Sequence, residues 1–161
     1  MNDIELKLCD IQGRLFELSV ERQLKSASFI KVFMNSETSK ALDSTYNRMQ
    51  WAGEEYLLEE VVDAAGDKVS KGGEIYSKDL IYWIGYIYRY FVITYELTSM
   101  QVYKIVKPKE LKGLFLPYHT MDPSQAIERI LEAKGMFIDE ETELQRQYEI
   151  FKRIRMSKKD K

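Results

Sequence analysis

The sequence has few of the residues that build common catalytic and metal sites. Its 161 residues include one cysteine, one histidine and three prolines. The single cysteine, Cys9, excludes a disulfide within the chain and is typical of a reducing compartment, so we expect a cytoplasmic protein. The single histidine, His119, is too few for the usual zinc sites, which need several Cys and His ligands. We therefore predict neither a metal nor a cofactor.

Motifs of enzymes and membrane proteins are also missing. Gly72-Gly73 lacks the Gly-Lys-Ser/Thr context of a phosphate-binding loop, and no serine or cysteine nucleophile matches His119 in a recognisable arrangement. The N-terminal residues MNDIELKLCD carry acidic side chains where a secretory signal needs positive charge. The longest apolar run, 80–97, is interrupted by Arg89, which argues against a membrane span. We expect no catalytic residues and no membrane association.

The hydrophobic pattern that is present is helical. Apolar residues recur at intervals of three and four, and no segment alternates apolar and polar residues long enough to require a strand. The best strand candidates, Tyr103–Val106 and Met136–Ile138, are short. We predict an all-α fold, a compact multi-helix domain of about six to eight helices. Residues 1–138 should form this single domain, and residues 139–161 a C-terminal helix with a basic tail that packs on it or projects from it.

Local signals locate several helix ends. The segment Tyr46–Ala65 is predicted to be one helix, because its apolar residues keep helical spacing. Thr98 begins a capping-box pattern for a short helix. Pro108 can occupy the first position of the next short helix, which Pro117 should close. Asp122, followed by a proline, is the clearest helix start in the chain.

The dominant feature is the aromatic run LIYWIGYIYRYFVITYEL at 80–97. It predicts a central helix at about 77–97. One stripe of this helix should face the core: Leu80, Ile84, Ile87, Phe91 and Tyr95. On the opposite side Tyr82, Tyr86 and Arg89 lie at positions i, i+4 and i+7, so their side chains should be neighbours.

Three interpretations of Tyr82, Tyr86 and Arg89 stay open. A planar cation beside two phenols is typical of the hot spots of protein interfaces. The same trio can bind a small ligand that carries a carboxylate, a phosphate or an aromatic ring. Alternatively, other helices of the domain cover these residues, and Arg89 pairs with an acidic residue such as Glu55 or Glu59.

Two further residues, Trp51 and His119, are candidates for a partner-binding surface. His119 precedes Asp122 closely enough to suggest an acid–base pair, but Asp122 is already accounted for as a helix cap. The acidic run Glu54–Glu60 has no Glu-x-x-His segment to complete a two-metal site, so it is better explained as a solvated helix face.

The C-terminal segment is locally basic, and Lys152, Arg153 and Arg155 would be suited to contact phosphates. The whole chain, however, has 24 basic and 26 acidic residues and a net charge of −2. Global charge therefore favours neither nucleic acid nor a membrane surface. No helix-turn-helix signature stands out, which weakens a nucleic-acid-binding role.

Three stretches resemble a family of small all-helical bacterial proteins from toxin–antitoxin-like gene neighbourhoods: Phe29–Val61, Ile75–Phe91 and Tyr118–Ile130. The resemblance covers about residues 28–132. Its most specific pieces are Trp51 with Gly-Glu-Glu-Tyr two residues later, the Tyr-x-Tyr-Arg-Tyr cluster that contains Arg89, and the His-Thr-Met-Asp segment. The resemblance implies the antitoxin-side partner of a toxin. The apolar Phe91-Val92-Ile93 departs from the family pattern, which has a polar turn there.

The sequence thus favours a non-catalytic protein-binding module, and the resemblance implies that it neutralises a cognate toxin by occlusion. The expected partner-binding residues are Tyr82, Tyr86, Arg89, Trp51 and His119. The partner would be a protein encoded by a neighbouring gene, and a second copy of the chain is also left open. One alternative is a small enzyme or ligand-binding domain that uses Arg89 and His119. Another is a nucleic-acid-binding regulator that uses the basic C-terminal helix.

Overall fold

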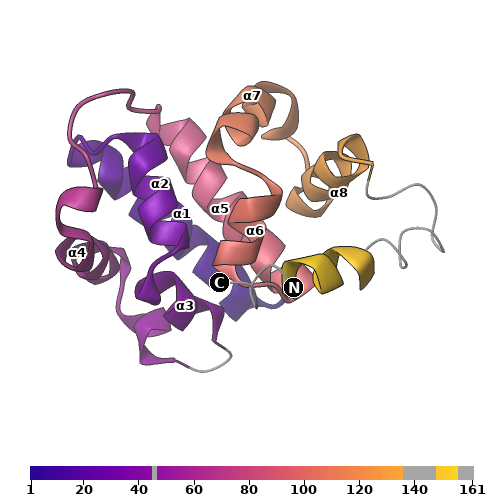
Figure 1. Cartoon of the computed structure of the whole chain (residues 1–161), viewed down its shortest axis with the longest axis horizontal. Helices are drawn as coiled ribbons and strands as arrows, with labels where there is room; N and C mark the ends of the chain where they lie inside the picture. The colour runs from indigo at the N-terminus through magenta and orange to yellow at the C-terminus, as the bar shows by residue number, and fades with distance from the viewer. Residues whose placement is uncertain (45–46, 136–147, 156–161) are drawn as a thin grey trace. The chain divides into compact units, whose positions relative to one another are not determined.

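The computed structural model describes residues 1–44, 47–135 and 148–155 (Figure 1). These residues form helices and one isolated bridge between Leu24 and Lys71, but no strand. The all-α prediction is therefore confirmed. The described part contains eight labelled α-helices, two 3₁₀ helices and a helical stretch at 148–155, slightly more than the six to eight helices expected.

The chain divides into two units, Met1–Thr120 and Met121–Lys161. The predicted boundary near residue 139 lies outside the described residues. The first unit contains α1 (Asp3–Glu21), α2 (Ser26–Met34), α3 (Glu37–Asp43), η1 (Arg48–Trp51), α4 (Glu54–Ala65), η2 (Gly66–Lys68), α5 (Lys78–Tyr95), α6 (Ser99–Ile105) and α7 (Pro108–Tyr118). The second unit contains α8 (Pro123–Ala133) and the stretch 148–155.

Several helix starts follow the sequence signals. The Ser77 hydroxyl accepts a hydrogen bond from the Leu80 amide and caps α5. Thr98 forms a complete capping box at the start of α6, and Asp122 caps α8. These caps satisfy amides that have no partner inside the helix, which is why short polar side chains mark the starts so reliably.

Two predicted boundaries were wrong. The helix expected over Tyr46–Ala65 is interrupted, and only α4 forms a full α-helix there. Gly53 adopts φ = 86° between η1 and α4, a conformation that a continuing right-handed helix does not contain. In α7, Pro117 lies inside the last turn and does not close the helix, because the His119 amide still donates to the Phe115 carbonyl at 2.8 Å.

The helix expected at about 77–97 is present as α5, which packs along α1. Gly13 on α1 and Gly85 on α5 let the two backbones approach closely. A Cβ atom on Gly85 would lie 2.8 Å from the Gln12 carbonyl oxygen and 3.1 Å from the Gly13 Cα. We call this close contact between Gly13 on α1 and Gly85 on α5 the α1–α5 seam. A larger residue at the seam would push the helices apart, because it would meet backbone atoms, which cannot rotate away as a side chain can.

The seam decides which residues of α5 are buried. Of the predicted core stripe, Leu80, Ile84, Ile87 and Phe91 are buried, while Tyr95 is half-buried. On the opposite side, Gly85 and Arg89 are buried against α1, while Tyr82 and Tyr86 are half-buried. Much of the helix surface is thus covered, which explains why so few of its residues are polar.

Candidate functional site

Arg89 is enclosed by the first unit, with an exposed fraction of 0 %. Its Nε donates to Gln12 Oε1 at 2.7 Å, its Nη1 to Asp43 Oδ1 at 2.6 Å and its Nη2 to Ser99 Oγ at 3.1 Å. We call Arg89, Gln12, Asp43 and Ser99 the Arg89 network. It joins α5 to α1, to the end of α3 and to the start of α6.

The members of the Arg89 network also satisfy one another. The Ser99 amide donates to Asp43 Oδ2 at 2.8 Å and its hydroxyl donates to Asp43 Oδ1 at 2.6 Å. The side-chain amide of Gln12 donates from Nε2 to the Gly85 carbonyl oxygen at 2.9 Å. A buried charge that is paired and hydrogen-bonded in this way is a stable structural element. Arg89 has the intrachain partner that the third interpretation required, but that partner is Asp43 and not Glu55 or Glu59.

The two tyrosines of the predicted trio lie nearer the surface than Arg89. Tyr82 is half-buried, and its hydroxyl donates to Asp10 Oδ1 at 2.5 Å. Burial, with the hydrogen bond to the Asp10 carboxylate as the next cause, raises the pKa of Tyr82 well above its usual range. Tyr86 is half-buried too, and its ring lies 6.0 Å from that of Tyr82. The structure thus keeps the tyrosines together but turns Arg89 into the interior.

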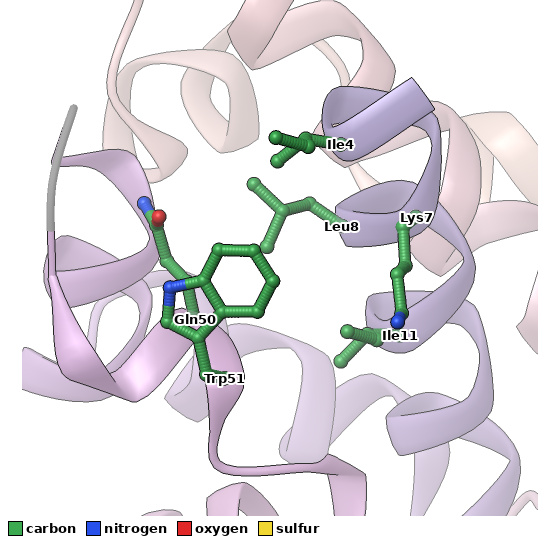
Figure 2. A pocket seen from close by; sticks show the side chains of 6 residues that line it. All are labelled: Ile4, Lys7, Leu8, Ile11, Gln50 and Trp51. Atoms are coloured by element: carbon green, nitrogen blue, oxygen red, sulfur yellow. The ribbon is translucent and has the colours of Figure 1, made fainter. Parts of the chain in front are cut away.

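Trp51 is placed differently, at the surface of the first unit, with 66 % of its side chain exposed. It lines an open groove between α1 and η1 of about 200 Å³, including the part open to solvent. Figure 2 shows the indole ring facing Leu8 across this space. We call the lining residues the Trp51 groove: Ile4, Lys7, Leu8, Ile11, Gln50 and Trp51.

The wall that carries Trp51 is held by Gln50, which is itself buried. The Gln50 side-chain amide donates to the carbonyls of Leu42 and Ser44. These two residues flank Asp43, which binds Arg89. On the other wall, Gln12 follows the groove residue Ile11 along α1. The Arg89 network is therefore connected to both walls of the Trp51 groove through residues that are adjacent in sequence.

His119 does not line the Trp51 groove. It is exposed, its ring is stacked on Phe115 with 4.3 Å between ring centroids, and its Nδ1 lies 2.6 Å from the Phe115 carbonyl oxygen. Arg89 and His119 share no hydrogen bond in the described part of the chain. Asp122 serves as the α8 cap, and the hydrogen bonds from Ser124 hold its pKa below the usual value.

Other predicted sites can be located only in part. Lys152, Arg153 and Arg155 lie on the stretch 148–155, and Arg153 Nη2 is 4.0 Å from a carboxylate oxygen of Glu149. Among described residues no three Asp, Glu, His or Cys side chains gather as potential metal ligands. None of the described helices combines the length and apolar character needed to cross a membrane.

Sequence reasoning missed Gln12, Asp43 and Ser99 as partners of Arg89. Asp43 is 46 residues from Arg89, so no local spacing links the two. The glycines at the α1–α5 seam were a usable signal, because glycine inside a helix lowers its stability unless a neighbour needs the space.

We found no family model that matches this chain, no similar curated protein and no similar solved structure. The resemblance to antitoxin-side proteins therefore stays a prediction from the sequence.

Proposed function

We propose that this chain is a non-catalytic protein-binding module whose partner docks in the Trp51 groove. The observation that carries the proposal is the 66 % exposure of Trp51 beside an apolar helix face. Tryptophan is the residue most enriched at interface hot spots, because it buries a large rigid surface on binding. Ile4, on the facing helix, is 56 % exposed as well.

The open shape of the Trp51 groove fits a protein partner better than a small ligand. The groove is open to solvent, whereas sites for small ligands enclose most of the ligand surface. The groove also lacks converging charged side chains, since Lys7 is the only charged residue in its lining. A few apolar side chains of a protein would fill it.

We further propose that α5 is the central element of the fold in this role. Its residue Arg89 binds Gln12, which follows the groove residue Ile11, and Asp43, whose neighbours accept hydrogen bonds from Gln50. Arg89 would then act as a positioning residue and would not touch the partner. Tyr82 and Tyr86, which stay half-buried beside α1, would contribute at the margin of the surface.

The resemblance extends the proposal to a toxin as the partner, neutralised by occlusion of its substrate cleft. Nothing in the geometry of the groove specifies that activity. The enzyme alternative loses its main support, because the guanidinium of Arg89 already binds three side chains and is closed to solvent. For the regulator alternative, no observation beyond the basic residues themselves favours nucleic acid.

The test is co-expression with the product of the adjacent gene, followed by affinity measurement on the purified complex. Trp51→Ala should weaken binding by about 2 kcal/mol or more, a loss of roughly 30-fold. Leu116→Ala is the matched control, because Leu116 is an 80 % exposed apolar residue on α7 outside the groove. Equal affinity of the two variants would refute the groove as the docking surface.

A further inference from the structure

We propose, building on the function above, that the docking segment of the partner is an acidic amphipathic helix. Its apolar side chains fill the Trp51 groove, and its carboxylates bind Lys7 and Arg48. The apolar and basic residues of this chain that carry the proposal lie on α1 and η1, within the first unit.

The shape of the groove favours a helix as the docking segment of the partner. Ile4, Leu8 and Ile11 occupy positions i, i+4 and i+7 of α1, so they form one apolar stripe on a single face. At a rise of about 1.5 Å per residue the stripe is roughly 10 Å long, which is two turns of a facing helix. The described residues contain no sheet whose edge could add a strand, so an extended partner has no backbone to pair with.

The positive charges of Lys7 and Arg48 favour an acidic partner. Lys7 lies in the lining itself, between Ile4 and Leu8 on the same face of α1. Arg48 and Trp51 are three residues apart in η1, and side chains with that spacing in a 3₁₀ helix lie one above the other. Both cations are exposed. Lys7 therefore belongs to the lining of the groove, and Arg48 lies next to the groove residue Trp51 along η1.

Neither cation is neutralised within the described residues. No ion pair joins Lys7 or Arg48 to a carboxylate there. The next basic residue along α1, Arg14, is by contrast paired with Asp10 at 3.0 Å. Asp3 precedes Lys7 by one helical turn but forms no ion pair with it in that part of the chain. An incoming carboxylate thus finds two cations that no described carboxylate pairs with, close to an apolar stripe.

The fluorescence of Trp51 can be used to measure binding in the groove. The chain has two tryptophans, and Trp83 is buried against Phe115 at a centroid distance of 5.8 Å. In a full-length Trp83→Phe variant the tryptophan emission comes from Trp51 alone. The probes are two synthetic helical peptides without tryptophan, with leucine at positions i, i+4 and i+7. One peptide carries glutamate at all flanking positions and the other carries lysine.

The acidic peptide should shift the Trp51 emission to shorter wavelength, because burial removes water from the indole. It should bind about tenfold more tightly than the basic peptide, as expected for two exposed charge pairs whose sign is reversed. The double variant Lys7→Glu/Arg48→Glu should invert this preference. Lys31→Glu/Lys109→Glu is the control, since it makes the same change in net charge at exposed lysines on α2 and α7. This control should keep the preference for the acidic peptide.

The remaining outcomes separate the two proposals. Equal binding of both peptides would overturn the acidic partner but leave a protein-binding groove. No shift with either peptide up to roughly 1 mM would contradict the proposed function as well. A shift that depends on protein concentration without any peptide would identify a second copy of the chain as the occupant, and would overturn the acidic helix.

Discussion

Two regions of the first unit are built around a basic side chain and an aromatic segment: the Arg89 network inside it and the Trp51 groove at its surface. In the network each of the three nitrogens of the Arg89 guanidinium donates to an oxygen on another helix. At the groove, Lys7 and the nearby Arg48 on η1 form no ion pair with a carboxylate among the described residues, and Trp51 remains exposed. Both regions contain basic side chains, and the difference lies in whether described residues of the chain pair with them.

This difference separates a structural role from an available surface. A buried guanidinium with an ion pair cannot be removed without leaving an uncompensated carboxylate, so the Arg89 network should control stability. An exposed tryptophan contributes little to the folded chain but much to a complex, so the Trp51 groove should control binding. The following changes begin with the largest expected effect on stability near neutral pH and end with the smallest.

Arg89→Ala should give the largest loss. It leaves the Asp43 carboxylate, whose side chain is 10 % exposed, without its cation. We expect the free energy of unfolding to fall by about 3–5 kcal/mol. Urea titration followed by circular dichroism measures it. Arg14→Ala, which breaks the exposed pair with Asp10, should cost at most about 1 kcal/mol. Similar losses in both variants would mean that the network is not a special element.

Gly85→Ala should follow, because it tests the seam that brings Gln12 to Arg89. The added methyl group would meet the Gln12 carbonyl oxygen at 2.8 Å, and overpacking of this kind costs about 1–3 kcal/mol. Gly113→Ala is a matched control inside α7, where a Cβ meets nothing within 4 Å. The control should be neutral or stabilising by up to about 1 kcal/mol. Thermal denaturation of both variants distinguishes them, and a stable Gly85→Ala protein would contradict the close seam.

The buried thiol of Cys9 should make the stability of the protein depend on pH above pH 9.0. Burial raises the pKa of its thiol from 9.0 to about 12. The thiol ionises more readily in the unfolded chain, so its contribution to stability is complete below pH 9.0 and is lost progressively up to about pH 12. Wild type should lose up to about 1.4 kcal/mol per pH unit more than Cys9→Ala in this window. Identical slopes of unfolding free energy against pH would show that Cys9 is open to solvent in the folded state.

Trp51→Ala should have the smallest effect on stability, within about 0.5 kcal/mol of wild type. The reason is its 66 % exposure, which leaves little surface to lose. Chemical unfolding of Trp51→Ala next to Arg89→Ala checks the ranking directly. A loss comparable to that of Arg89→Ala would place Trp51 in the core and remove the contrast between the two regions.

Local features of this fold were predictable from sequence because local interactions determine them. Ser77, Thr98 and Asp122 mark helix starts, since each bonds to an amide two or three residues away. The helix over Tyr46–Ala65 was overextended because its hydrophobic period continues through Gly53, where the backbone turns. Whether Arg89 or Trp51 is covered depends on helices distant in sequence, such as the Asp43 end of α3. Periodicity within one helix carries no information about that.

The most direct test of the contrast is acrylamide quenching of Trp51 fluorescence in the Trp83→Phe protein, with and without the acidic peptide. We predict strong quenching of the free protein, because Trp51 is exposed, and a marked fall in the quenching constant when the peptide is bound. Trp83 in a Trp51→Phe protein should be poorly quenched in both conditions, because it is buried. A Trp51 quenching constant that is already low in the free protein, or that the peptide leaves unchanged, would contradict an open docking groove.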